Sequence, residues 1–217
     1  MFTVSQERIV YSTQPTRGQE YTDKMDEAYS FMAKFYDAFT FIFPFWKKWI
    51  KSVIPFIKGE DILEVSFGPG YLMKQYAKNY RVRGIDYNKD MVALTRKKCS
   101  KLVPEENIIE GNVESLPYKD NTFDTVINTM AYTGYPDGKK ALKEMLRVLK
   151  PQGKLLLVDF DYPENKNIFG YTMVKIMEAG GDIIKNIYED LKNLPCKTEK
   201  KVAGGFGSVY LFIITKS

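Results

Sequence analysis

The pattern of apolar and polar residues changes character after residue 57. Before that point, aromatic and methionine side chains recur at intervals of three and four residues over 23–43, which predicts an amphipathic helix. Pro44 interrupts this pattern, and a second short helix is predicted over 45–56. We therefore expect an N-terminal tail and aromatic helical lid at 1–57, followed by a core at 58–217 that completes one structural domain.

In the core, short apolar runs alternate with amphipathic segments. Strands are predicted over 61–65, 81–85, 107–110, 123–127 and 153–158. Helices are predicted between them, over 71–78, 89–101 and 138–149, the last of them stopped by Pro151-Gln152-Gly153. This alternation is typical of βαβ units and a mainly parallel sheet.

The C-terminal part of the core follows a different pattern. After a helical segment at 167–193, two further strands are predicted at about 198–203 and 208–215. The glycine-rich link at 204–207 is too short for a crossover, so these strands form an antiparallel hairpin. The sequence therefore predicts an open α/β sheet of about seven strands that is mostly parallel and ends in a hairpin.

Composition excludes several kinds of chemistry. The chain has 217 residues, 44% of them apolar, which is enough for a sizeable core, and it contains no histidine. The absence of histidine excludes histidine-based triads, histidine-ligated zinc and a histidine general base. Cys99 and Cys196 are too few for a cysteine-only zinc site or a disulfide framework. We expect a cytoplasmic protein with free thiols and no metal.

The charge pattern leaves two interpretations open. The formal net charge is +5. The stretch 74–101 contains nine Lys or Arg residues but only two acidic residues, Asp86 and Asp90. This cluster is either the solvated outer surface of two helices or a contact for an anionic partner or a membrane surface. The polar residues 1–12 do not resemble a secretory signal, and the apolar run 39–46 is far shorter than the roughly 20 residues of a spanning helix. We expect no transmembrane segment.

The strongest candidate for a ligand site follows the first predicted strand. In an open α/β sheet, ligands lie beyond the carboxyl ends of the strands. There, Gly68 and Gly70 let the backbone turn sharply after Glu64. Asp86 ends the next strand, where a carboxylate can accept hydrogen bonds from the two hydroxyls of a ribose. A purely structural turn is the alternative for the glycines alone.

The residues around this turn distinguish between nucleoside ligands. A dinucleotide motif needs a third small residue where this chain has Met73, and Glu64 would repel a pyrophosphate. The P-loop lysine pattern is also absent. A nucleoside without phosphate and with a positive charge near Glu64 fits better. S-adenosylmethionine, which carries an ammonium and a sulfonium, is such a ligand.

Four motifs in order carry a resemblance to a known family. They are LEVSFGPG at 63–70, GIDYNKDM at 84–91, GNVESLPYKDNTFD at 111–124 and LKEMLRVLKPQGK at 142–154. The stretch 61–159 resembles the class I S-adenosylmethionine-dependent methyltransferases, above all their small-molecule branch, which includes the ubiquinone and menaquinone biosynthesis enzymes. The resemblance implies a Rossmann-like fold, S-adenosylmethionine as cofactor and S-adenosylhomocysteine as product, without a metal.

By position, the resemblance implies that residues at the carboxyl ends of the first four strands bind this cofactor. Those implied for the methionine part, where Glu64 would reach the ammonium, are Glu64, Ser66, Gly68, Gly70 and Asn128. Those implied for the ribose and the adenine are Asp86, Tyr87, Met91, Asn112 and Val113.

Two of these residues depart from the family pattern. Ser66 stands where the family has its first glycine, so we expect a stiffer turn and a slightly shifted cofactor. Asn112 stands where the family has an aspartate, and it offers both an acceptor and a donor to the adenine. These departures are the support for the alternative hypothesis of a non-catalytic S-adenosylmethionine- or nucleoside-binding module or partner subunit. An NAD-dependent oxidoreductase is a third hypothesis, opposed by Met73 and Glu64.

The reaction implied is in-line methyl transfer to a small, apolar or aromatic acceptor. The clue to the acceptor is the aromatic content of the lid, at Phe31, Phe35, Tyr36, Phe39, Phe41, Phe43, Phe45, Trp46 and Trp49. Three interpretations of these residues are open. They pack the helices on the sheet, they line a pocket for an apolar or aromatic acceptor, or they contact a lipid or prenylated substrate beside Lys47, Lys48 and Lys51. A nucleic-acid acceptor is disfavoured, because the segment after the fourth strand, 128–132, lacks the Pro-Pro pair of base-methylating enzymes.

The pattern assigns no catalytic residue. Asp159 and Asp161 end the fifth predicted strand on the acceptor side of such a sheet. Each carboxylate is either a base for the acceptor or a cap for the loop that follows.

Overall fold

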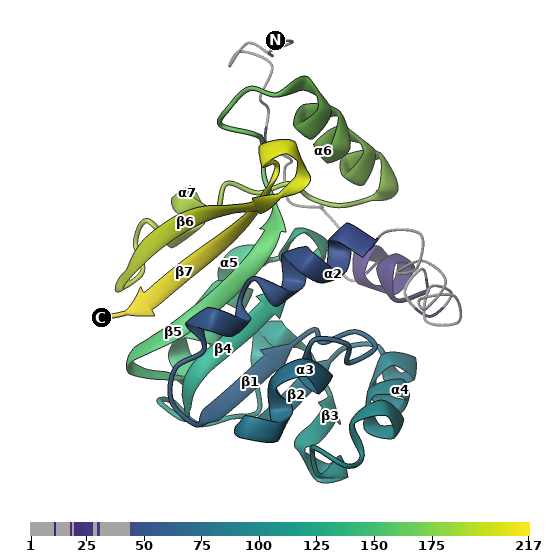
Figure 1. The fold of residues 1–217 in the computed structure, drawn as a ribbon, viewed down its shortest axis with the longest axis vertical. Helices are drawn as coiled ribbons and strands as arrows, with labels where there is room; N and C mark the ends of the chain where they lie inside the picture. Colours follow the sequence, from purple (N-terminus) through teal and green to yellow (C-terminus); the bar gives the residue numbers. More distant parts are fainter. Residues whose placement is uncertain (1–10, 12–17, 19, 28–29, 31–43) are drawn as a thin grey trace.

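The computed structural model describes residues 11, 18, 20–27, 30 and 44–217. Its seven strands are β1 (Asp61–Val65), β2 (Arg81–Asp86), β3 (Ile108–Glu110), β4 (Phe123–Thr129), β5 (Leu149–Phe160), β6 (Cys196–Gly204) and β7 (Val209–Lys216). They form one sheet in the order β3-β2-β1-β4-β5-β7-β6 (Figure 1). The first five pair in parallel, and β7 runs antiparallel to both of its neighbours. The predicted open sheet with a C-terminal hairpin is confirmed.

Helices cover both faces of the sheet. They are α2 (Pro44–Lys51), α3 (Met73–Tyr76), α4 (Lys89–Cys99), α5 (Gly138–Val148), α6 (Ile168–Gly180) and α7 (Ile187–Leu191), and residues 20–27 are also helical. One apolar core lies between the sheet and α2, α3 and α4, and the other lies between the sheet and α5 and α7. Strand alternation separates the two cores, because Ile62 joins the first and Leu63 the second. Figure 1 shows α2 in front of the sheet and α5 behind it.

Polar side chains set the starts of the main helices. The capping residues, each of which accepts a hydrogen bond from a backbone N–H in the first turn, are Asn88 for α4, Asp137 for α5, Asn167 for α6 and Asn186 for α7. Helix α6 ends at Gly181, whose φ of 111° suits glycine. This glycine divides the predicted helical segment 167–193 into α6 and α7.

Strand β5 is longer than the sequence predicts. It begins at Leu149 instead of Gly153, because Leu149 already pairs with Phe123 of β4. The register then shifts before Thr125 pairs with Lys154, and Gln152 takes up the irregularity with a φ of 60°. The Pro151–Gly153 turn therefore interrupts the strand pairing instead of separating the helix from the strand.

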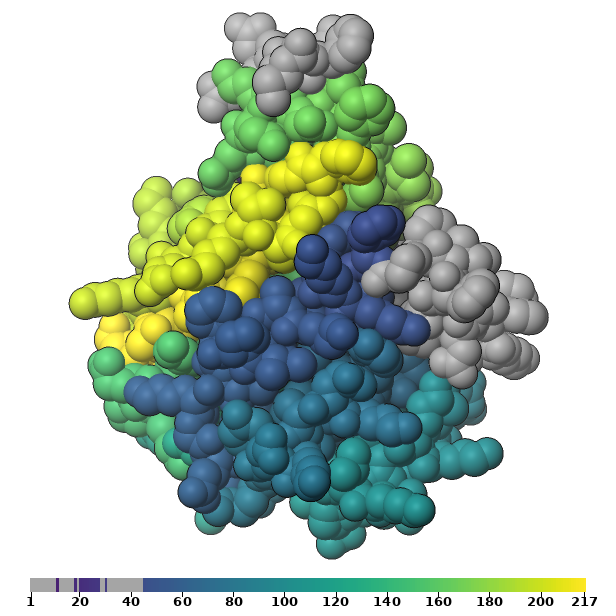
Figure 2. Space-filling model, viewed as in Figure 1, coloured from purple at the N-terminus to yellow at the C-terminus, as the bar shows by residue number. Residues whose placement is uncertain are grey.

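Helix α2 packs directly on the sheet. The Trp46 and Trp49 rings lie 6.4 Å and 6.3 Å from the ring of Phe160, measured between centroids. A side chain at Gly204 of β6 would overlap the indole of Trp49, so glycine is needed there. Figure 2 shows α2 in dark blue against the yellow C-terminal hairpin. The lid boundary at residue 57 stays a prediction, because 31–43 lie outside the described residues.

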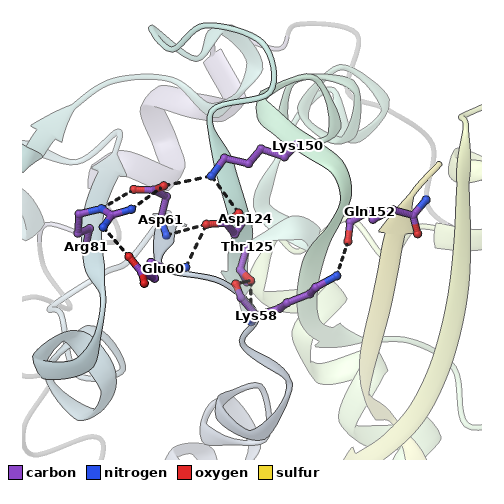
Figure 3. A network of polar contacts seen from close by, with 8 residues as sticks. All are labelled: Lys58, Glu60, Asp61, Arg81, Asp124, Thr125, Lys150 and Gln152. Carbon is purple, nitrogen blue, oxygen red and sulfur yellow. Dashed lines mark hydrogen bonds and ion pairs between the residues drawn. The ribbon is translucent and has the colours of Figure 1, made fainter.

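A network of ion pairs and hydrogen bonds joins the amino ends of the strands (Figure 3). Asp124 Oδ2 accepts the N–H groups of Glu60 and Asp61 at 3.0 and 2.9 Å, while its Oδ1 accepts Lys150 Nζ at 2.9 Å. Asp61 in turn binds Arg81 through two bonds of 2.8 and 3.0 Å. The network therefore connects β1, β2, β4 and β5 at the edge opposite the glycine turn.

The charged partners hold these carboxylates in the ionised state. Hydrogen bonds from Arg81 lower the pKa of Asp61 to about 2. Desolvation acts to raise the pKa of Asp124, but hydrogen bonds from the Asp61 and Glu60 backbone and from Lys150 outweigh it, so the net pKa lies below the ordinary 3.8.

In the part of the chain that the structure describes, no helix is long and apolar enough to cross a membrane.

We expect Asp124→Asn to lower the free energy of unfolding at pH 7 by about 1–3 kcal/mol, because an amide has one acceptor oxygen for three donors. Urea unfolding measures this change, and Glu60→Gln, at a side chain 72% exposed, is a control that we expect to have little effect. Because the pKa of Asp124 is lowered in the fold, its contribution is complete above about pH 4 and disappears as the pH falls through the lowered pKa. A difference between wild type and variant that is unchanged at pH 2 would contradict this assignment.

Candidate functional site

The turn after β1 has an unusual backbone. Ser66, Gly68 and Gly70 have φ values of 51°, 55° and 71°, all in the left-handed region. Among the described residues, a side chain at Gly68 would meet nothing within 4 Å, so these residues leave open space beside it. A side chain at Gly70 would lie 2.7 Å from Thr95 of α4, so this glycine is required by helix packing. Of the two glycines predicted to lie under the methionine part, Gly68 is therefore the one that leaves room for a ligand.

Asp86 at the end of β2 holds this turn in place. Its Oδ2 accepts the Gly68 N–H at 2.8 Å, and its Oδ1 accepts the Asn88 N–H at 3.0 Å. Burial raises its pKa to about 6, although hydrogen bonds from the backbone oppose the shift. The Tyr87 backbone is a third donor to this carboxylate, so one lone pair remains that can accept a hydroxyl group of a ligand.

Glu64 is a buried carboxyl group with one unused oxygen. Its exposed fraction is 1%, and its Oε2 accepts the Tyr76 hydroxyl at 2.7 Å. Its Oε1 has no hydrogen-bond partner among the described residues. Burial raises the pKa to about 8, and the bond from Tyr76 only partly opposes this. A buried acceptor of this kind is costly unless a ligand supplies a donor.

Asn128, the second-to-last residue of β4, lies beside β1, since it pairs with Val65. It is fully buried, and its Nδ2 donates to the Tyr135 hydroxyl at 2.6 Å. Within the described part of the chain, its Oδ1 is the second buried side-chain oxygen without a partner. Tyr135 Oη also lies 2.6 Å from Ser66 Oγ, and burial raises the pKa of this phenol. The sequence pattern did not single out Tyr135, which lies in the loop after β4.

The residues predicted to bind adenine lie after β2 and β3. The carboxyl ends of these two strands are adjacent, because the Gly111 N–H donates to the Asp86 carbonyl at 2.9 Å. Tyr87 is 40% exposed, whereas Met91 and Val113 are buried at 3% and 6%. Asn112 Oδ1 accepts the Glu114 N–H at 2.8 Å, so its amide caps the turn at 113–115 as an aspartate could.

The N-terminal helical segment spans the same edge of the sheet. Asn88 Nδ2 donates to Asp26 Oδ1 at 2.8 Å and to Ser30 Oγ at 2.7 Å. On the other side, the Tyr21 hydroxyl donates to the Gly181 carbonyl at 2.8 Å. Six of the predicted lid aromatics lie outside the described residues: Phe31, Phe35, Tyr36, Phe39, Phe41 and Phe43.

The two candidate bases at the end of β5 are engaged within the fold. Asp159 is fully buried and accepts the N–H groups of Thr133 and Phe160 at 3.0 and 2.7 Å. Burial raises its pKa to about 6. Asp161 binds Lys200 at 2.9 Å and accepts the Tyr162 N–H at 2.7 Å. This geometry favours the loop-capping interpretation for both carboxylates.

Comparisons with known proteins show the family to which the chain is related. A model of the methyltransferase domain family matches residues 63–157. The chain is 34% identical over 170 residues to YdaC, an uncharacterized methyltransferase of Bacillus subtilis, covering 72% of this chain and 91% of YdaC. It is 30% identical over 158 residues to the ubiquinone/menaquinone biosynthesis C-methyltransferase UbiE of Pasteurella multocida, covering 69% of this chain but only 59% of that enzyme.

A solved structure shares the fold. This is the S-adenosylmethionine-dependent methyltransferase of Thermotoga maritima described as a possible histamine N-methyltransferase, which matches with a TM-score of 0.67 at 16% identity. The match covers 86% of this chain and 98% of that one. With the family model, the YdaC relationship and the seven-stranded sheet in agreement, the chain belongs to the class I S-adenosylmethionine-dependent methyltransferases.

Proposed function

We propose that this methyltransferase binds S-adenosylmethionine at the turn after β1 and transfers its methyl group to a small apolar or aromatic acceptor. The observation that carries the proposal is the buried Oε1 of Glu64, just before the glycine turn, which has no hydrogen-bond partner among the described residues. A cationic donor satisfies this atom and compensates the charge of the ionised carboxylate. A pyrophosphate would instead be repelled by it.

The other contacts follow from the positions of the side chains. Asp86 accepts a ribose hydroxyl with the lone pair that the N–H groups of Gly68, Asn88 and Tyr87 leave unused. The space beside Gly68 takes the methionine part. The adenine lies at the ends of β2 and β3, against Tyr87, Met91, Asn112 and Val113.

When bound, the cofactor supplies an electrophilic methyl group on a sulfonium. The residues of the chain then have to align the acceptor and exclude water. Asn88 contributes to this by attaching the N-terminal helical segment to the loop beside Asp86. We assign no residue as a base, because Asp159 and Asp161 both have capping roles.

The acceptor class is supported by the relatives and the lid composition. The UbiE relatives are named as C-methyltransferases of quinone biosynthesis, so a compact aromatic ring is the acceptor that we propose here. Trp46 and Trp49 pack on Phe160 of the sheet, so in this proposal the lid over the acceptor takes its aromatic residues from the rest of 1–57.

We expect the purified protein to bind S-adenosylmethionine and S-adenosylhomocysteine with micromolar affinity and not to bind NAD. Asp86→Ala should weaken the binding of both compounds at least about 100-fold. The variant loses the ribose contact and also the hydrogen bond from the Gly68 N–H that holds the turn. Titration calorimetry measures both effects.

Asp90→Asn is the matched control, because this carboxylate lies close to Asp86 in the sequence but is exposed in the first turn of α4. It should bind the cofactor as wild type does. A folded wild type that binds neither compound would refute the cofactor assignment.

We expect the affinity for S-adenosylhomocysteine to rise with pH between about 6.5 and 8, by at most about tenfold per unit. The pKa of Glu64 is about 8 in the free protein, and the ligand ammonium requires the ionised carboxylate. For the free protein the sign is opposite. A carboxyl pKa raised above its unfolded value of 4.5 means that stability falls as the pH rises from 4.5 to 8.

Glu64→Gln should remove the pH dependence of binding between 6.5 and 8 and the contribution of Glu64 to the pH dependence of stability, while Asp86 and Asp159 keep theirs. It should also weaken ligand binding and stabilise the free protein at pH 8. Calorimetry and urea unfolding at several pH values test these expectations. An affinity that is constant from pH 6.5 to 8 would exclude Glu64 as the group that meets the ammonium.

We expect label from methyl-labelled S-adenosylmethionine to appear in a small hydroquinone or phenol when a panel of quinols, phenols and amines is tested. Asp86→Ala should abolish transfer, and Asp90→Asn should retain it. Transfer to amines alone would overturn the proposed acceptor class. Cofactor binding without transfer to any acceptor would support the non-catalytic binding module instead.

A further inference from the structure

Helices α2 and α3 expose lysines on a side of the molecule where their sequence contains no acids. Neither 44–59 nor 65–80 contains an aspartate or a glutamate. Among the described residues, no carboxylate forms an ion pair with the exposed lysines of α2, α3 and the turn after α3, which are Lys48, Lys51, Lys74 and Lys78. Their positive charge is therefore not compensated within the described part of the chain.

The opposite face of the sheet compensates more of its charge. Arg147 of α5 binds Glu144 and Asp120, each at 2.7 Å. Lys139, also of α5, lies 3.8 Å from Asp190 of α7. Ion pairs thus neutralise part of the positive charge on this face, whereas α2 and α3 leave theirs available for an anionic partner.

Helix α2 also exposes an aromatic ring beside its lysines. Its inward side chains, Trp46, Trp49 and Ile50, belong to the apolar core. Phe45 is 68% exposed and lies three residues before Lys48, so both side chains are on the outward stripe of the helix. Aromatic residues beside lysines on the solvent side of a helix are typical of contact with a membrane surface.

A second group of exposed apolar side chains lies on α6 and at the tip of the C-terminal hairpin. Phe169 and Phe206 are 62% and 60% exposed, and their ring centroids are 5.7 Å apart. Ile176, two turns further along α6, is 64% exposed on the same side of the helix as Phe169. Phe206 has a φ of 55°, a left-handed conformation that strains a residue with a side chain. The hairpin therefore presents this ring to solvent at a cost in strain.

Contacts join these elements into one continuous surface. A side chain at Gly170 of α6 would lie 2.9 Å from the Phe206 carbonyl, and Gly204 of the hairpin lies against Trp49 of α2. Lys47 of α2 lies over the ring of Tyr71, just before α3, at 5.2 Å from its centroid. Helices α2, α3 and α6 all pack on the same apolar core. Figure 2 shows this surface from outside, with the yellow hairpin between α6 in green and α2 in dark blue.

We propose that this surface, formed by the outward side chains of α2, α3, α6 and the hairpin tip, docks on an anionic lipid bilayer. The lysines attract the negatively charged headgroups, and Phe45, Phe169 and Phe206 enter the interfacial layer. Ile176 has no ring on which a base could stack, which favours lipid over nucleic acid. Lysine is depleted from protein–protein interfaces, which favours lipid over a protein partner. The inference does not depend on the proposed function, because no cofactor contact enters it.

Sedimentation with lipid vesicles tests the proposal. We expect the purified protein to sediment with vesicles of phosphatidylcholine mixed with an equal part of phosphatidylglycerol. It should stay in the supernatant with vesicles of phosphatidylcholine alone. Raising the salt concentration from about 0.1 M to about 1 M should lower the bound fraction severalfold, because the screening length falls from about 10 Å to about 3 Å.

Three lysines of the surface should carry much of the affinity. The combined substitution to glutamine of Lys48, Lys51 and Lys74 should weaken vesicle binding at least about tenfold, because each lysine near an anionic surface contributes about fivefold. The matched control removes the same charge from exposed positions on α5, across the sheet, by substituting glutamine for Lys139, Lys140 and Lys143. It should bind vesicles nearly as wild type does.

The aromatic rings are tested by Phe169→Ser combined with Phe206→Asn, since asparagine tolerates the left-handed φ. This variant should bind anionic vesicles about tenfold more weakly. Val202→Thr is the control. Its 65% exposed side chain lies between Lys201 and Ala203, which are on the α2 side of the sheet, so it points to the other side. Urea unfolding with the wild-type midpoint shows that each variant is folded.

Each result decides the proposal. A wild type that does not sediment with the anionic vesicles would overturn it, and so would equal sedimentation with both kinds of vesicle. Equal losses in the two lysine combinations, or wild-type affinity in the aromatic variant, would overturn it as well. Binding of oligouridylate instead of vesicles would assign the surface to nucleic acid. None of these results depends on S-adenosylmethionine, so the proposed function stands or fails separately.

Discussion

The hydrogen bond from the Gly68 N–H to Asp86 is the interaction on which the candidate site depends. It joins the turn after β1 to the end of β2 and fixes a backbone that three left-handed residues would otherwise leave free to adopt other paths. The same carboxylate accepts the Asn88 N–H, and the Asn88 side chain caps α4 and reaches the N-terminal helical segment. The turn, α4 and the N-terminal helical segment thus take their positions from one buried acid.

The two edges of the sheet differ in how their charges are compensated. At the amino edge, Asp61 and Asp124 each have cationic partners, and their pKa values lie below the ordinary range. At the carboxyl edge, Glu64 and Asp86 are buried with no cation beside them among the described residues, and their pKa values lie above the ordinary range. The first arrangement stabilises the fold. The second leaves binding capacity for a ligand at a cost in stability, which is common where a protein binds a charged group.

Much of the fold was predictable because its signals are local. Helix α5 shows its buried stripe in the spacing of Ala141, Leu142, Met145 and Leu146, and the hairpin follows from the length of its glycine link. The early start of β5 was not predictable, because Leu149 becomes a strand residue only by pairing with Phe123 of another strand. Tyr135 was missed for a similar reason: its role depends on Ser66, 69 positions away in the sequence.

The sequence by itself determined the order of elements, the acids at the ends of β1 and β2, and the family resemblance, because periodicity and motif spacing are properties of neighbouring residues. It also revealed Ser66 and Asn112 as departures. Only the tertiary structure decided what those departures do, since Ser66 completes a hydrogen-bond chain and Asn112 caps a turn. It also showed that Asp159 and Asp161 accept hydrogen bonds from backbone N–H groups of the loops beside β5. Hydrogen-bond partners and burial depend on which distant segments meet, and a linear pattern does not contain that information.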